Sequence, residues 1–151
     1  MSNVIPLKQK EYNFEKEIND LTTLCKEDLV SVNTIILDKL DSNVPLVHEV
    51  AKYLILSGGK RLRPLLTVAS YHMVNNYQPT KANLINHIGL ASAVEFIHTA
   101  TLLHDDVIDE SRQRRGKPTA NEKWKNKTSV LVGDFLFSRA FQLMTKYGNA
   151  N

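Results

Sequence analysis

The chain has 151 residues, of which 42% are apolar and 23% are charged, and its formal net charge at pH 7 is +3. A chain of this size can bury one core, which favours a single globular domain, and its small positive charge gives no reason to expect a nucleic-acid partner. A lone cysteine, Cys25, excludes an internal disulfide, and the lack of an apolar run of about 18 residues or of a signal-peptide pattern predicts a cytoplasmic protein without a transmembrane segment.

Helical patterns fill the first half of the chain. Apolar residues recur every three or four positions over residues 14–36, which predicts one long helix that ends near residues 41–43. Pro45 begins a second predicted helix, and the glycine pair within residues 57–59 ends it. A third helix is predicted over residues 65–75.

The second half continues in the same way. Residues 75–79 have the composition of a loop, and residues 81–109 carry apolar side chains on nearly every side, as expected of a helix buried inside a bundle. Residues 110–127 are polar and predict another loop, before a last helix over residues 128–148. A buried strand over residues 130–132 is the alternative, but the apolar pattern runs past the usual length of a strand. With no β-hairpin signal, repeat or interdomain linker, the sequence predicts an all-α fold.

An acidic cluster ends the predicted helix 81–109. Asp105 and Asp109 are four residues apart, so in a helix they share a face, about 6 Å apart along the axis, while Asp106 lies about 100° around. Hard oxygen ligands at this spacing can hold Mg²⁺ and leave coordination positions for water and phosphate oxygens. The plainer interpretation is a solvated helix end, but acidic residues are unfavourable at a helix C-terminus. The cluster therefore predicts an Mg²⁺-diphosphate site.

Two basic clusters flank this acidic one in the sequence. The first occupies the glycine-containing segment 57–64 and the second follows Asp109 within eight residues; their basic members are Lys60, Arg61, Arg63, Arg112, Arg114, Arg115 and Lys117. Each could be a solvated turn. Arginines beside carboxylates can also form bidentate bonds to diphosphate oxygens that a metal leaves free, and a helix N-terminus favours anions. Together the clusters predict two separate diphosphate sites.

Three linked segments resemble one known family. Gly58-Gly-Lys-Arg-Leu-Arg-Pro64, the run from Glu95 to Glu110 that contains the aspartates, and Arg114-Arg-Gly-Lys-Pro-Thr119 are similar in order and spacing to those of trans-polyprenyl diphosphate synthases. The resemblance is nearest to long-chain, octaprenyl-type members and runs from about Lys8 to the end of the chain. It implies an isoprenoid-synthase helical bundle, with residues 1–151 as the N-terminal portion of a single synthase domain.

The resemblance also implies a reaction. Members of the family use Mg²⁺ to add isopentenyl diphosphate head-to-tail to an allylic prenyl diphosphate, and the cycle repeats to build a long all-trans polyprenyl diphosphate for isoprenoid and quinone side chains. The allylic diphosphate ionises to a cation, which the isopentenyl double bond attacks. The family further implies a homodimer.

The roles of individual residues follow from the same resemblance. Asp105 and Asp109 match the Mg²⁺ ligands, with Asp106 as a helper, and Arg114 matches a contact to the allylic diphosphate. The residues implied for the isopentenyl diphosphate site are Gly59, through its backbone, and Lys60, Arg63, His98 and Arg115.

His98 can be weighed from its position in the sequence alone. A histidine in an apolar helix is more often a satisfied core residue than a ligand. Its position in the helix favours a place in the diphosphate site, because the spacing of His98, Asp105 and Asp109 puts them on one helix face. Glu95, Thr99 and His104 are expected to be structural.

Product length is implied by two residues that precede the first aspartate. In the family, the positions four and five residues before it line the tunnel that receives the growing tail, and large aromatic side chains there stop growth early. Here these positions hold Thr101 and Ala100, so a long product is favoured over a C15 product.

One expected feature of the family is missing. Members carry a second Asp-rich motif far downstream that completes the metal site, whereas this chain stops at Asn151 without one, so we expect the chain alone not to turn over.

Three other functions fit the sequence less well than a prenyl synthase does. A terpene cyclase would not need the basic segment 57–64, and a noncatalytic partner subunit of a heteromeric synthase would be expected to lose the aspartates. A nucleic-acid binder would need one continuous basic face.

Overall fold

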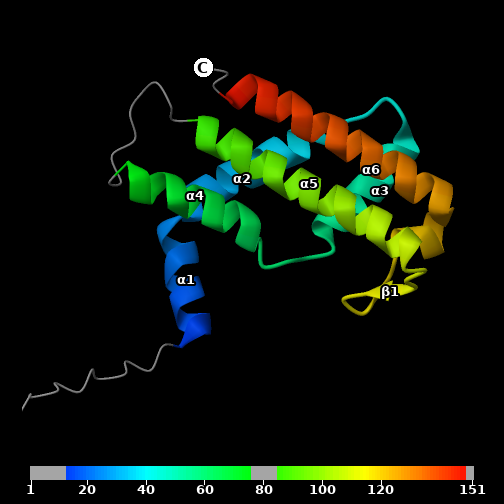
Figure 1. Ribbon diagram of the computed structural model, residues 1–151, viewed down its shortest axis with the longest axis horizontal. Helices are drawn as coiled ribbons and strands as arrows, with labels where there is room; N and C mark the ends of the chain where they lie inside the picture. The colour runs from blue at the N-terminus through cyan, green and yellow to red at the C-terminus, as the bar shows by residue number, and fades with distance from the viewer. Residues whose placement is uncertain (1–12, 76–84, 149–151) are drawn as a thin grey trace, which may run out of the picture.

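The computed structural model describes residues 13–75 and 85–148. Within them the chain is almost entirely helical, with a small antiparallel hairpin between the last two helices (Figure 1). The elements are α1 (Phe14–Leu24), α2 (Lys26–Lys39), α3 (Pro45–Leu56), α4 (Leu62–Val74), α5 (Asn86–Ile108), β1 (Gln113–Arg114), β2 (Lys117–Pro118) and α6 (Ala120–Tyr147). The predicted all-α fold is confirmed. No helix in these ranges is both long enough and apolar enough to cross a bilayer.

The single long helix predicted for residues 14–36 is wrong, because the chain bends at Cys25 and forms α1 and α2. Cys25 has φ −94° and ψ 13°, outside the helical region. The backbone hydrogen bonds continue through the bend, from Cys25 N to Leu21 O at 3.0 Å and from Leu29 N to Cys25 O at 3.0 Å. A bend that keeps the apolar spacing on both sides leaves no trace in the sequence pattern.

The segment between α3 and α4 confirms the predicted break and moves one boundary. α3 begins at Pro45, whose fixed φ suits the first turn of a helix. Gly58 has φ +88° and Arg61 has φ +48°, so the chain reverses there through left-handed conformations. α4 therefore begins at Leu62, three residues before the predicted start, with Pro64 inside its first turn.

α5 and α6 form the centre of the bundle. They lie side by side and run in opposite directions (Figure 1), and each contributes fully buried side chains such as Phe96 and Leu136 to the core. Their axes come close at Gly133, where an added Cβ would lie 2.2 Å from His104 Nε2. The Nε2 atom of His104 is within hydrogen-bond distance of the carbonyl oxygen of Val130, at 3.1 Å, which agrees with the structural role expected of His104.

The loop predicted over residues 110–127 is wrong in part. A hairpin pairs β1 with β2 through a turn in which Arg115 and Gly116 have φ +52° and +74°, and α6 begins at Ala120. The helix is interrupted at Lys125, with φ 75° and ψ 158°, so its first turn is a separate piece. That turn is fixed by Trp124, whose ring meets the ring of Tyr53 edge-on at 5.1 Å. The residues around Trp124 are polar, so no apolar period marked this turn.

The remaining predictions concern the ends of α5 and α6. Residues 130–132 are helical and not a strand. The loop predicted over residues 75–79 and the start of the helix predicted over residues 81–109 lie largely outside the described residues. α6 ends at Tyr147 with Gly148 next to it, as predicted.

Candidate active site

The acidic cluster lies at the C-terminal end of α5. Asp105 is in the last turn and Asp109 follows the helix end, with its backbone N–H donating to Asp105 O at 2.8 Å. Both carboxylates are exposed, and neither side chain makes a hydrogen bond or an ion pair within the described parts of the chain. Two exposed, unengaged carboxylates one helical turn apart are a donor set that fits Mg²⁺.

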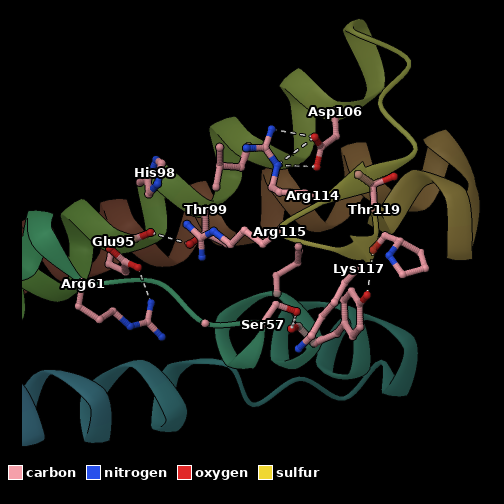
Figure 2. A pocket seen from close by; sticks show the side chains of 15 residues that line it. Ser57, Arg61, Glu95, His98, Thr99, Asp106, Arg114, Arg115, Lys117 and Thr119 are labelled. Carbon is pink, nitrogen blue, oxygen red and sulfur yellow. Dashed lines mark hydrogen bonds and ion pairs between the residues drawn. The ribbon is translucent and has the colours of Figure 1, made fainter.

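Asp106 differs from its acidic neighbours because it is buried, with 1% of its surface exposed. Arg114 of β1 donates to it from Nη2 to Oδ1 at 2.8 Å and from Nε to Oδ1 and Oδ2 at 3.1 and 3.2 Å (Figure 2). These hydrogen bonds raise the pKa of Arg114. The Arg114 side chain stays about one-third exposed, so it can hold Asp106 and still present a face to an anion.

A basic pocket of about 450 Å³ brings together the residues implied for isopentenyl diphosphate. They come from three parts of the chain: the segment before α4 together with its first turn, the middle of α5, and the turn of the hairpin. The pocket is lined by Gly59, Lys60, Arg61, Leu62, Arg63, Glu95, His98 and Arg115. A Cβ added at Gly59 would lie 2.8 Å from Arg115 Nη1, so the guanidinium of Arg115 lies directly against the backbone of Gly59. All five predicted residues of this group therefore meet in one place.

Arg61 has a different role from its basic neighbours. It forms an ion pair with Glu95, which is 7% exposed, and its Nη2 donates to the carbonyl oxygen of Ile55 at 2.8 Å. Figure 2 shows this pair at one side of the site, with the Thr99 hydroxyl donating to the Glu95 carbonyl. Arg61 links the loop before α4 to α5, and Glu95 and Thr99 make these contacts within the fold.

His98 lies where positive charge gathers. Its pKa is lowered from the usual 6.5, first by burial and then by the charge of Arg63, with Arg115 and Arg114 adding to the effect against Glu95. The neutral imidazole is therefore favoured before an anion binds. An anion in the pocket would reverse this balance, because negative charge favours the protonated ring.

A second pocket adjoins the basic one and shares Arg61, Glu95, His98 and Arg115 with it. Sequence reasoning did not find one of its lining residues, Tyr53, whose hydroxyl donates to the carbonyl oxygen of Pro118 at 2.8 Å and ties α3 to β2. Tyr53 is an ordinary helix residue with no motif around it, so no sequence signal marked it.

Comparison with known proteins places this geometry in a family. The polyprenyl synthetase family model matches residues 44–151. The chain belongs to the polyprenyl synthetase family. It is 48% identical over 137 residues to the octaprenyl diphosphate synthase of Escherichia coli, an alignment that covers 91% of this chain and 39% of that enzyme.

Solved structures agree with this membership. A decaprenyl diphosphate synthase from Rhodobacter capsulatus is 54% identical with a TM-score of 0.79, over 87% of this chain and 39% of that one. A polyprenyl synthase from Caulobacter crescentus, solved with calcium and isoprenyl diphosphate, is 47% identical with a TM-score of 0.81, over 88% and 39%. The chain thus spans about two-fifths of the length of these polyprenyl synthetases.

The two residues implied for chain length occupy different surroundings in this polyprenyl synthetase chain. Ala100 is fully buried in the core. Thr101 is half-buried, and its hydroxyl donates to the carbonyl oxygen of His98 at 2.8 Å. Both lie in α5 on the N-terminal side of the aspartates.

Proposed function

We propose that this chain is the part of a cytoplasmic, homodimeric trans-prenyltransferase that carries the first metal motif and the isopentenyl diphosphate site. The reaction is the Mg²⁺-dependent condensation of isopentenyl diphosphate with an allylic diphosphate, repeated to give a long all-trans polyprenyl diphosphate of the octaprenyl type. The observation that supports this most is spatial: the basic pocket lies beside α5, the helix whose C-terminal end presents the exposed carboxylates Asp105 and Asp109.

The residues at the end of α5 suit the leaving diphosphate. Asp105 and Asp109 would hold Mg²⁺, which supplies positive charge to the diphosphate as its bond to the allylic carbon breaks. Arg114, held in place by the buried Asp106, would orient the same diphosphate through its exposed face. An arginine that is already fixed in place stabilises the charge of the transition state more than a mobile arginine does, because it needs no reorganisation during the reaction.

The basic pocket would hold the second substrate. Lys60, Arg63 and Arg115 would neutralise the isopentenyl diphosphate, and His98 would donate to it once protonated. Gly59 would contribute its backbone N–H, in a place where the chain approaches Arg115 closely. Held in this way, the isopentenyl group could reach the allylic cation formed beside Asp105 and Asp109, and the released diphosphate would accept the proton that is lost.

Product length follows from the small residues of α5. With alanine at position 100 and threonine at 101, no large side chain blocks the path below the aspartates, so the tail can grow. The octaprenyl and decaprenyl names of the relatives support a long product. Retention of both exposed aspartates favours a catalytic chain over a noncatalytic partner subunit.

A chimera tests the proposal. This chain would replace the 137 aligned residues of the E. coli octaprenyl diphosphate synthase, and the purified protein would be incubated with labelled isopentenyl diphosphate, an allylic diphosphate and MgCl₂. We expect long-chain polyprenyl diphosphates that disappear when EDTA is added. A chimera that is folded by circular dichroism and dimeric, but forms no condensation product while the unmodified E. coli enzyme does, would contradict the proposal.

A further inference from the structure

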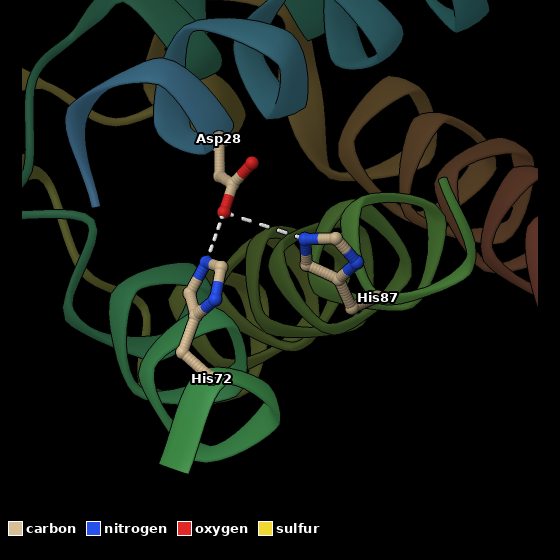
Figure 3. Close-up of side chains that lie close together, drawn as sticks. All are labelled: Asp28, His72 and His87. Atoms are coloured by element: carbon tan, nitrogen blue, oxygen red, sulfur yellow. Dashed lines mark hydrogen bonds and ion pairs between the residues drawn. The ribbon is translucent and has the colours of Figure 1, made fainter. Parts of the chain in front are cut away.

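Three side chains that the proposed reaction does not use converge at the other end of α5. Asp28 comes from α2, His72 from the last turns of α4, and His87 from the first turn of α5 (Figure 3). Asp28 Oδ2 lies 2.5 Å from His72 Nε2 and 3.3 Å from His87 Nε2. One donor atom from each residue lies within 4.8 Å of the other two. Two imidazoles and one carboxylate therefore face a common point.

His87 is the most unusual member of the cluster. It is 5% exposed, and neither of its ring nitrogens makes a hydrogen bond. Its ring is stacked on Tyr71, with centroids 3.9 Å apart and planes 1° from parallel, which fixes its orientation towards Asp28. Burying an imidazole without hydrogen bonds costs free energy, so a buried ring aimed at a carboxylate and a second imidazole calls for a further partner.

We propose that Asp28, His72 and His87 form a binding site for a divalent transition metal, with Zn²⁺ as its preferred occupant. Imidazole nitrogen and carboxylate oxygen are ordinary ligands of Zn²⁺ at about 2.0–2.2 Å, and a tetrahedron of such bonds has edges of about 3.3 Å. The separation of His87 Nε2 from Asp28 Oδ2 is 3.3 Å. Mg²⁺ is disfavoured here because it prefers all-oxygen ligands.

Metal entry requires one local adjustment. The 2.5 Å between His72 and Asp28 is a hydrogen-bond distance, and it must widen by about 0.8 Å to fit the edge of such a tetrahedron. Both side chains are in contact with solvent, since 16% of the His72 side chain and 22% of the Asp28 side chain are exposed. The same exposure lets a water molecule reach the fourth coordination position.

The site is separate from the proposed reaction centre. His87 precedes Asp105 by 18 positions in α5, which corresponds to about 27 Å along the helix axis. The metal would join α2, α4 and α5 at this end of the bundle and act as a cross-link, stabilising the fold by binding only the folded chain. The competing interpretation is a metal-free network in which Asp28 bonds to the imidazoles.

Calorimetry on the purified 151-residue chain, freed of any affinity tag and treated with EDTA, separates the two interpretations. We expect titration with ZnCl₂ to show one Zn²⁺ bound per chain and the thermal midpoint to rise, with neither effect from MgCl₂. Because imidazole must be unprotonated to bind a metal, acidifying the buffer should weaken binding. Absence of Zn²⁺ binding by the folded chain up to millimolar concentration would establish the metal-free network and overturn the proposal.

Variants identify the ligands. His87→Phe keeps an aromatic ring against Tyr71 and removes both nitrogens, and we expect the dissociation constant for Zn²⁺ to rise at least about 100-fold, since even outer residues of metal sites are worth about 10- to 100-fold. The matched control is His104→Phe, because His104 is another α5 histidine beside a carboxylate, 3.6 Å from Asp134. Equal affinity in the His87→Phe chain and the wild type would overturn the assignment.

Cys25, three residues before Asp28, is the one thiol that could compete as a ligand. It is buried, and its sulfur is not among the donor atoms of Asp28, His72 and His87 that lie within 4.8 Å of one another. Cys25→Ser should therefore leave Zn²⁺ affinity unchanged. Co²⁺ gives an answer that does not depend on any variant: the wild-type chain should show visible d–d bands without a thiolate charge-transfer band. A charge-transfer band, or loss of binding in Cys25→Ser, would contradict the proposed ligand set.

Discussion

Arg114 of β1 donates hydrogen bonds from both Nε and Nη2 to the buried carboxylate of Asp106 at the end of α5. The backbone carbonyl of Asp106 also accepts from Ser111 N at 2.9 Å. Asp106 therefore fixes the segment that follows α5. Since Arg115 follows Arg114 directly, the same contact positions a residue of the basic pocket relative to the free carboxylates Asp105 and Asp109.

The first prediction concerns the strength of this contact. Asp106→Asn keeps the shape of the side chain and removes its charge, and we expect it to lower the free energy of unfolding by about 2 kcal/mol. Breaking a fully buried pair costs about 3–5 kcal/mol, and Arg114 is about one-third exposed. Asp134→Asn, at a carboxylate that is 64% exposed, is the control and should change stability by less than about 0.5 kcal/mol. Urea denaturation curves that coincide for wild type and Asp106→Asn would show that the contact is not structural.

A second prediction separates the two substrates. Arg63→Ala in the chimera should raise the KM for isopentenyl diphosphate and leave the KM for the allylic diphosphate nearly unchanged, because Arg63 lines the basic pocket. Arg112→Ala removes the same charge from an exposed position that lines neither pocket, and it should leave both KM values near those of the parent. Steady-state kinetics with each substrate varied in turn gives the answer. If only the allylic KM responds, the two sites have been assigned the wrong way round.

The third prediction is a pH dependence at His98. The pKa of this imidazole is below 6.5 in the free site, and a bound diphosphate should raise it. The complex then holds a proton that the free site lacks, so binding takes up a proton and tightens as the pH falls from neutral through 6.5 towards the lowered pKa.

Calorimetry of isopentenyl diphosphate binding in buffers with different ionisation enthalpies counts this proton. We expect uptake by the parent chimera and markedly less by His98→Gln, after the common contribution of the phosphate groups. Equal proton uptake in both would show that His98 does not face the diphosphate.

The fourth prediction concerns product length. Ala100 is fully buried in α5, and Ala100→Phe in the chimera should place a ring below the aspartates, about one helical turn along the axis. Products should shift from long chains towards C15 or C20 while the first condensation survives. Ala100→Val should give a smaller shift. Overpacking costs about 1–3 kcal/mol, so thermal midpoints must accompany the product analysis. An active Ala100→Phe chimera with unchanged products would remove the main support for the long-chain assignment.

Much of the site was predictable because its residues are close in sequence or lie on one helix face. The phase of His98 relative to Asp105 is fixed by helical geometry, and Gly59 and Lys60 are adjacent in the sequence. The split of the first predicted helix at Cys25 was not predictable, because the apolar period continues across the bend.

Contacts between distant residues were the other part that sequence could not give. Arg61 looked like another phosphate ligand, and only the fold shows that it is paired with Glu95, 34 positions away. The cluster of Asp28, His72 and His87 is assembled from three helices, so no local sequence pattern predicted it. Tertiary packing decided these cases, where sequence spacing carries no information.

The most direct test of the proposed metal-assisted reaction is the condensation rate of the chimera with Asp105→Asn or Asp109→Asn. Each change keeps the shape of the side chain and removes one charge from a carboxylate that has no partner in the described residues. Glu110→Gln, the same change at the adjacent exposed carboxylate, is the control. We predict a loss of about 100-fold or more for each aspartate, with little change in stability, and a near-parent rate for Glu110→Gln. Parent-like rates in a folded Asp105→Asn chimera would contradict the proposal that this residue holds Mg²⁺ on the leaving diphosphate.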